Sequence, residues 1–315
     1  MRLVFCGTPE FAVPPLHALL DRGHEIALVL TQPDRPAGRR MEMHEPPVKR
    51  VALARGLHVL QPEKIKSNAE LRSELESIRP DAIVVVAYGR ILPGWMLELP
   101  PLGNLNLHGS LLPRYRGAAP IQWAVANGET ETGVTTMRLD AGLDTGDVLL
   151  ERRVAIGAET TATELYPQLA EIGAGLMVET LDGLERGTIK PRPQDHSRAT
   201  LAPILTREDG RMELEHRAAQ TVYNRWRGFA PWPGAHASFR GKRFLVHRMR
   251  LAAKGVEDGP RLRPGELAVS SDELYVGAAQ DTLLVLDEVQ IEGKPRLQGA
   301  VFARDFQLKP GESLA

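Results

Sequence analysis

The chain has 315 residues, of which 43% are hydrophobic and 25% are charged, as is usual for a globular protein with a packed interior. This composition excludes a disordered chain, a collagen and a coiled-coil rod. Lysine and arginine number 39 against 40 aspartates and glutamates, and a formal charge of −1, taken alone, argues against a nucleic-acid partner. The length predicts about two domains.

Cysteine usage and hydropathy indicate the compartment. Cys6 is the single cysteine, so no disulfide forms within the chain, and we expect a reducing environment. Gly7 and Pro9 come too early for the apolar region of a signal peptide. The longest purely apolar run, 82–87, is far shorter than the ~20 residues that span a bilayer. We therefore expect a soluble, cytoplasmic protein that makes no contact with a membrane.

The first half of the sequence alternates short apolar runs with helical patterns, which is typical of a parallel sheet covered on both faces. Strands are expected at 2–6, 26–31, 83–87, 104–107 and 134–139. Helices are expected at 14–21, 47–55, 68–77 and 118–127. A further helix begins near Thr161 with a capping box and has apolar residues every three or four positions up to Leu184. The pattern predicts a doubly wound, Rossmann-like α/β domain.

The pattern changes between Gly187 and Thr206, where prolines in a polar stretch without periodicity predict a linker. Beyond it, short β-type runs separated by turn residues predict a small OB-like β-barrel. These runs are 244–247, 274–276 and 283–286. We expect an α/β domain at 1–189, a linker at 190–206 and a barrel domain at 207–315.

The net charge conceals a basic segment. Residues 190–250 hold 13 lysines and arginines but 5 aspartates and glutamates, so the remainder of the chain is acidic. Aromatic residues such as Trp226 and Phe239 lie among these cations. Cations release counterions from phosphates, and aromatic faces stack on unpaired bases. The segment indicates either a nucleic-acid surface or a solvated basic face, and composition does not decide between them.

Asn106 and His108 lie two residues apart at the end of an expected strand, so their side chains share a face. Ligands of open α/β sheets bind beyond the carboxyl ends of the strands. A carboxamide beside an imidazole at that place could stabilise an oxyanion and move a proton. The pair could equally cap a turn.

A glycine-rich loop at 140–147 carries three aspartates: Asp140, Asp144 and Asp147. A carboxylate near His108 would orient the imidazole and raise its proton affinity. Spacing does not show which aspartate does so, and all three are common turn formers.

We expect neither a metal site nor a dinucleotide site. The nine histidines form no pair at ligand spacing, and one cysteine cannot build a thiolate cluster. The segment Gly7-Thr-Pro-Glu10 does not match G-x-G-x-x-G.

Two segments together resemble the folate-dependent formyltransferase family: NLHGSLLPRYRGAAPIQ at 106–122 and DTGD at 144–147. Three others resemble the branch of that family that formylates methionine esterified to initiator tRNA. They are TQPDRPAGR at 31–39, AYGRILP at 87–93 and NRWRGFAPWPG at 224–234. The resemblance covers nearly the whole chain.

The resemblance implies transfer of the formyl group of 10-formyltetrahydrofolate to the α-amino group of methionine on initiator methionyl-tRNA, by a monomer and without a metal. It makes Asn106, His108 and Asp144 the catalytic residues, in a folate-binding domain at 1–189. The expected folate contacts are Ser110, Leu111, Leu112, Pro113, Ile91 and Leu92.

For tRNA, the resemblance implies a contact by the loop at 31–49, and the basic segment would add phosphate attraction from the barrel domain. The expected tRNA contacts are Arg39, Arg40, Arg225, Arg227, Lys242 and Arg243. The loop departs from the family pattern at Glu42 and Glu45, which dilute its positive charge.

Two alternatives stay open. The first is a related enzyme with the same catalytic residues, which would formylate a sugar nucleotide or hydrolyse 10-formyltetrahydrofolate. The second is a non-catalytic RNA-binding protein. The second domain and the segment 31–39 favour tRNA as the substrate, and the intact set of Asn106, His108 and Asp144 argues against a binding module.

Overall fold

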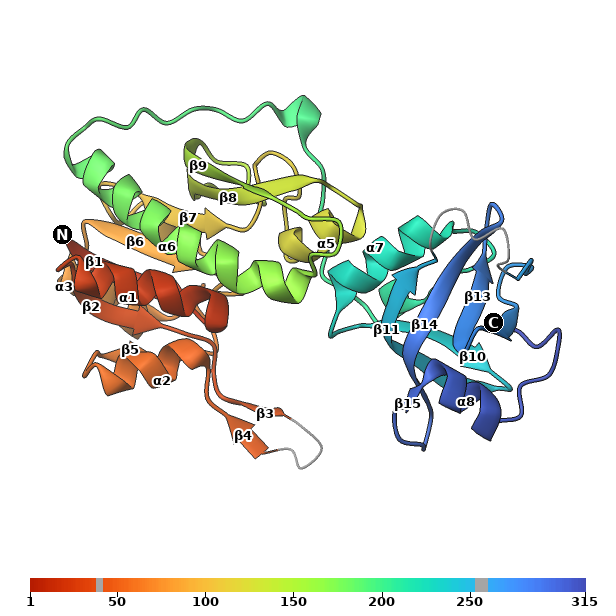
Figure 1. Cartoon of the computed structure of the whole chain (residues 1–315). Helices are drawn as coiled ribbons and strands as arrows, with labels where there is room; N and C mark the ends of the chain where they lie inside the picture. The colour runs from red at the N-terminus through yellow and green to blue at the C-terminus, as the bar shows by residue number, and fades with distance from the viewer. Residues whose placement is uncertain (38–41, 253–259) are drawn as a thin grey trace. The chain divides into compact units, whose positions relative to one another are not determined.

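In the computed structural model, residues 1–37, 42–252 and 260–315 are described, and they form two compact units (Figure 1). Unit 1 comprises Met1–Pro120, Glu131–Ala155 and Glu164–Pro203. Unit 2 comprises Ile121–Thr130, Ile156–Thr163 and Ile204–Ala315. Two short segments from the first half of the chain therefore pack in unit 2. The domain boundaries expected at 189 and 207 stay a prediction.

Unit 1 is built on a seven-stranded sheet with the order β5-β2-β1-β6-β7-β8-β9. Its strands are β1 (Arg2–Gly7), β2 (Glu25–Leu30), β5 (Val59–Leu60), β6 (Ala82–Val86), β7 (Asn104–His108), β8 (Glu131–Arg138) and β9 (Val148–Ala155). Strands from β5 to β7 pair in parallel, which confirms the Rossmann-like sheet, whereas β8 and β9 pair antiparallel at one edge. The sequence did not reveal β9, because this edge strand exposes Arg152 and Arg153.

Helices cover both faces of this sheet (Figure 1). They are α1 (Val13–Asp21), α2 (Pro47–Ala54), α3 (Ala69–Ile78), α4 (Gly94–Leu97) and α6 (Ala162–Glu185). On one face, apolar residues of α3 and α4 join those of β1, β2 and β6 in a single core cluster. On the other, α6 passes so close to β7 that a Cβ at Gly173 would lie 2.6 Å from the side chain of Leu107. A small hairpin, β3 (Arg35–Ala37) and β4 (Glu42–His44), follows β2.

Unit 2 contains an antiparallel sheet with the order β10-β11-β14-β13-β12, and β15 also pairs with β14. Its strands are β10 (Ala235–Phe239), β11 (Lys242–Leu251), β12 (Leu267–Ser270), β13 (Glu273–Ala278), β14 (Thr282–Ile291) and β15 (Leu297–Gln298). The core contains Phe239, Phe244 and Phe302, whose ring centroids lie 5.1–6.2 Å apart. Phe302 belongs to α8 (Gly299–Asp305).

The last residues of the chain link the two ends of this strand order. Ala315 exchanges two backbone hydrogen bonds with Ser238 of β10, and the amide of Leu267 in β12 donates to the carbonyl of Glu312 at 2.9 Å. The segment therefore bridges the strands that lie first and last in the sheet, which agrees with the expected barrel.

Two helices of unit 2 pack directly on each other: α5 (Pro120–Ala126) and α7 (Ala219–Phe229). A Cβ at Gly228 would lie 2.5 Å from the backbone nitrogen of Ala126, so this crossing requires glycine. Among the described residues, no helix is both long and apolar enough to cross a membrane.

Candidate active site

The strand β7 carries the first two candidate residues at the carboxyl end of the parallel strands. Asn106 is 8% exposed and His108 is 5% exposed, and both project from the same face of the strand. Asn104 lies on that face too, and its amide donates to the carbonyls of Met96 and Leu97 at 3.0 Å. Within the described residues, no protein group hydrogen-bonds the carboxamide of Asn106, so its donors are available to a substrate atom.

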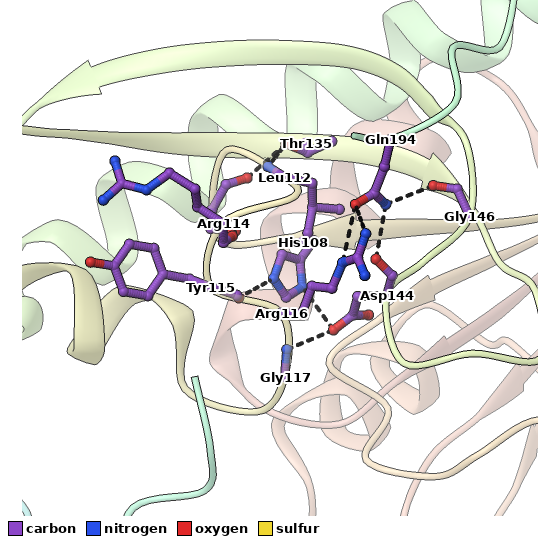
Figure 2. Close-up of polar contacts among 11 residues, drawn as sticks. His108, Leu112, Arg114, Tyr115, Arg116, Gly117, Thr135, Asp144, Gly146 and Gln194 are labelled. Atoms are coloured by element: carbon purple, nitrogen blue, oxygen red, sulfur yellow. Dashed lines mark hydrogen bonds and ion pairs between the residues drawn. The ribbon is translucent and has the colours of Figure 1, made fainter. Parts of the chain in front are cut away.

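The ring of His108 lies between two oxygen atoms (Figure 2). Its Nε2 is 2.9 Å from the carbonyl oxygen of Tyr115, and its Nδ1 is 3.7 Å from Oδ2 of Asp144. A carbonyl oxygen only accepts, so Nε2 must carry a proton. A second proton on Nδ1 would face the carboxylate. The ring is therefore held between a carbonyl oxygen and a carboxylate, which together fix its orientation.

The structure distinguishes between two of the aspartates of the β8–β9 loop. Asp140 accepts hydrogen bonds from the amide of Gly142 and the hydroxyl of Thr145 and so shapes the turn. Asp144 is the carboxylate brought to His108, and its Oδ2 also accepts a bond of 2.8 Å from the amide of Gly117. The φ angle of Asp144 is +51°, a left-handed conformation that aspartate tolerates better than most residues.

The loop after β7 is held by Thr135 of β8. Its hydroxyl donates to the carbonyl of Ser110 at 2.7 Å and accepts from the amide of Leu112 at 3.2 Å. Sequence reasoning missed Thr135, although a hydroxyl in a strand of buried residues is an indication that it serves a hydrogen bond.

Segment 194–202, all of it in the expected linker, packs against both loops of the site. The amide of Gln194 donates to the carbonyls of Asp144 and Gly146, and Gln194 accepts from Arg116. The hydroxyl of Thr200 accepts from the amide of Tyr115 at 2.8 Å. Sequence reasoning missed Gln194 and Thr200, because nothing in a proline-rich stretch shows that it returns to a loop 50 residues away.

The residues expected to bind folate differ in exposure. Ser110 is fully buried and its hydroxyl donates to the carbonyl of Arg114 at 2.6 Å. Leu112 and Leu92 are buried in core clusters, whereas Leu111 and Pro113 are half-buried and Ile91 is 93% exposed. The surfaces of Leu111, Pro113 and Ile91 are thus open to a ligand, and the folate contacts as a set stay a prediction.

Two residues expected to bind tRNA are built into the interior of unit 2 instead. Arg227 is 3% exposed, and its guanidinium donates to the carbonyls of Gly157 and Thr160. Arg225 donates to the carbonyl of Asp209 and lies over the ring of Phe229. Burial lowers the pKa of both guanidinium groups. A phosphate would have to displace these internal contacts, and a role for either residue in binding tRNA stays a prediction.

The other expected tRNA contacts are placed differently. Lys242 is exposed and Arg243 half-buried at the start of β11, whereas Arg39 and Arg40 lie outside the described residues. In the part of the chain that the structure describes, no group of three or more His, Cys, Asp or Glu side chains is placed to hold a metal ion.

Comparison with known proteins gives the family. The formyl transferase family matches residues 1–181, and the formyl transferase C-terminal domain matches residues 204–307. The methionyl-tRNA formyltransferase of Acidobacterium capsulatum is 60% identical over 98% of both chains, and that of Koribacter versatilis is 57% identical over 97% of this chain and 95% of its own.

Among solved structures, HypX from Aquifex aeolicus in complex with tetrahydrofolic acid matches with a TM-score of 0.64 and 21% identity. The match covers 99% of this chain and 48% of HypX, so the chain spans about half the length of that protein. This likeness concerns the fold. From the family matches and the identity to the two bacterial relatives, the chain belongs to the formyl transferase family and, within it, to the methionyl-tRNA formyltransferases.

Proposed function

We propose that the chain transfers the formyl group of 10-formyltetrahydrofolate to the α-amino group of methionine on initiator methionyl-tRNA, and so serves translation initiation. The observation that carries this proposal is the approach of Asp144 to His108, beside the carboxamide of Asn106, at the carboxyl end of β7. The names of the two bacterial relatives support the substrate, and the tetrahydrofolic acid complex of HypX supports a folate donor.

The reaction begins with attack of the amine nitrogen on the formyl carbon. An α-amino group has an ordinary pKa of about 7.7–8.0, so an appreciable fraction is unprotonated and nucleophilic at neutral pH. No covalent intermediate on the enzyme is needed. The formyl oxygen becomes an oxyanion, to which Asn106 donates a hydrogen bond, with the ring of His108 on the same face of β7.

Collapse of the tetrahedral intermediate breaks the bond between the formyl carbon and N10 of the folate. The attacking nitrogen loses one proton and N10 gains one, so the transfer is balanced without a further reactant. Asp144 keeps the ring of His108 oriented, and a water molecule between these groups and the amine would relay the proton. The products are formylmethionyl-tRNA and tetrahydrofolate.

For tRNA we propose two contact regions. The first is the loop at 31–49 with Arg39 and Arg40, and the second is the exposed start of β11 with Lys242 and Arg243. Salt-dependent attraction to phosphates is the expected contribution of such cations. Glu45 pairs with Lys49 at 3.0 Å, so these two charges of the loop offset each other.

The base of that loop is held by a polar clamp. Lys49 contacts Asp34 at 2.7 Å, and the amide of Gln61 donates to the same carboxylate at 2.7 Å. The hydrogen bond from Lys49, followed by that from Gln61, lowers the pKa of Asp34. The clamp fixes where the hairpin leaves the sheet, which supports a role for the loop in presenting its arginines.

The test is an assay with purified protein, 10-formyltetrahydrofolate and either initiator or elongator tRNA charged with methionine. We expect formylmethionine, detected by mass, on the initiator species. Release of tetrahydrofolate without tRNA would instead show a hydrolase, formylation of an amino-sugar nucleotide would show a sugar enzyme, and no release under any condition would show a binding module. We also propose that the enzyme is a cytoplasmic monomer, which light scattering and fractionation would test.

A further inference from the structure

Gln194 joins the β8–β9 loop to Arg116, although it lies 50 residues after Asp144 in the sequence. Its Nε2 donates to the carbonyl of Asp144 at 2.9 Å and to that of Gly146 at 2.7 Å (Figure 2). Its Oε1 accepts from Nε and Nη2 of Arg116 at 3.2 and 2.7 Å. Carbonyls only accept and a guanidinium only donates, so this is the one orientation of the amide that satisfies all four contacts.

These contacts are buried, which makes them costly to lose. Gln194 is 8% exposed and Arg116 is 7% exposed. A buried carbonyl that loses its donor keeps its desolvation penalty and gains nothing in return. Arg116 is itself fixed, because its backbone exchanges hydrogen bonds with Thr200 and Ala202 and its Nη2 lies 3.0 Å from Nδ1 of His196. Arg116 therefore gives the side-chain oxygen of Gln194 a fixed hydrogen-bond partner.

The two carbonyls that accept from Gln194 belong to Asp144 and Gly146. They lie in the turn that brings the carboxylate of Asp144 towards His108. Asp144 has a φ of +51°, which is a left-handed conformation. A residue other than glycine keeps this conformation only where surrounding contacts hold its backbone in place. One such contact is the bond from Gly117 to the carboxylate. The other is the pair of bonds from Gln194 to the backbone.

We propose that Gln194 is a positioning residue for formyl transfer, which holds the carboxylate of Asp144 against His108 through the backbone of the loop and is oriented by Arg116. This inference rests on the proposed function, because it assigns Asp144 a role in that reaction. Gln194 touches neither the expected substrate atoms nor the imidazole, so its effect is on turnover and not on binding.

Two substitutions separate the hydrogen bonds that Gln194 donates to the loop from those that it accepts from Arg116. Gln194→Ala removes both. Gln194→Glu keeps the oxygen that faces Arg116 but replaces the amide donor with an oxygen that repels the two carbonyls. In both variants we expect kcat to fall about 10- to 100-fold, since a displacement of about 1 Å in a catalytic group has effects of this size. The KM values for folate and tRNA should stay within about twofold of the original enzyme.

The matched control is Asp195→Asn at the neighbouring exposed position. Its Oδ1 can still accept from the amide and hydroxyl of Ser197, while one charge is lost. We expect this variant to keep the original kcat. Hydrogen exchange gives a second readout: in both Gln194 variants the amides of 142–147 should lose protection while those of β1 and β6 keep theirs.

Any of three other results would overturn the proposal. A near-original kcat in Gln194→Glu would show that the hydrogen bonds from Gln194 to the loop are not needed for turnover. A rise in KM with unchanged kcat would make Gln194 a binding residue, and loss of cooperative unfolding in both variants would make it a folding residue. The hydrogen-exchange result does not depend on the substrate, so failure of the original protein to formylate methionyl-tRNA would count against the proposed function alone.

Discussion

The carboxylate of Asp144 lies 3.7 Å from Nδ1 of His108 while the same oxygen accepts a hydrogen bond from the amide of Gly117. This double engagement allows the charge of Asp144 to be separated from its position. In Asp144→Asn, the amide oxygen can still accept from Gly117, but no negative charge faces the ring. We expect kcat to fall about 10²-fold or more, because the ring of His108 loses the carboxylate that orients it.

The control for that variant is Asp140→Asn in the same loop. Asp140 caps the turn through Gly142 and Thr145 and, among the described residues, forms no hydrogen bond or ion pair with His108, so a neutral oxygen there should keep both the turn and the activity. Equal losses in the two variants, measured as kcat for formyl transfer, would contradict the assignment of Asp144.

A second prediction uses two asparagines on the same face of β7. Asn106→Ala should lower kcat about 10²- to 10³-fold, the usual effect of removing one oxyanion donor, with little change in the free energy of unfolding. Asn104→Ala should do the opposite. It removes the donor to the carbonyls of Met96 and Leu97, which costs about 1–3 kcal/mol of stability, and leaves kcat per folded molecule unchanged.

Urea unfolding and steady-state formylation, measured on the same preparations, would test whether Asn106→Ala lowers kcat alone and Asn104→Ala lowers stability alone. Wild-type turnover in a folded Asn106→Ala variant would remove Asn106 from the mechanism.

A third prediction contrasts a buried arginine with exposed cations in unit 2. Arg227→Met removes this donor from the carbonyl of Thr160 and leaves that of Gly157 with the amide of Thr160 alone, so we expect a loss of about 1–3 kcal/mol in stability. Lys242→Ala and Arg243→Ala should leave stability nearly unchanged and weaken tRNA binding. Each should also reduce the slope of log affinity against log salt by about 0.7–0.9, the amount expected for one lost phosphate contact.

Binding titrations at several salt concentrations, together with thermal unfolding, would distinguish the two classes. An unchanged salt slope in the Lys242–Arg243 double variant would exclude this part of β11 from the tRNA surface.

The sequence predicted those parts of the molecule whose residues carry a local pattern. The valine-rich run of β6 is buried on both faces and reads directly as a central strand. Asn106 and His108 share a face because a strand has a period of two residues. The edge strand β9 was missed because arginines occupy its exposed positions.

What the sequence left open or did not reveal concerns relationships that no local pattern carries. Spacing could not show that Asp144, and not Asp140, faces His108, because that depends on the path of the β8–β9 loop. Composition does not distinguish a solvated cation from one that, like Arg227, hydrogen-bonds two backbone carbonyls of its own unit. Gln194 depends on a chain segment that returns to a distant loop.

The last prediction concerns pH and the closure of the barrel. Arg240 donates hydrogen bonds from Nε and Nη2 to the carboxylate of Glu312, both at 2.7 Å. Glu312 lies shortly before the end of the chain that pairs with β10. The hydrogen bonds from Arg240, followed by one from the amide of Lys309, lower the pKa of Glu312 from its ordinary value of 4.5 to about 2. Because this pKa is lower in the folded state, the carboxylate contributes its full stabilisation above pH 4.5 and loses it as the pH falls towards 2.

Glu312→Gln should therefore lower the Tm at pH 6 to 7, and its difference from the original protein should shrink steadily between pH 4.5 and 2. Glu208→Gln is the matched control, because Glu208 pairs with Arg211 at 3.4 Å on an exposed turn and its loss should give no such trend. Thermal unfolding of the three proteins across this range would decide the matter. A difference that stayed constant with pH would show that Arg240 and Glu312 contribute through packing and not through the charge of the carboxylate.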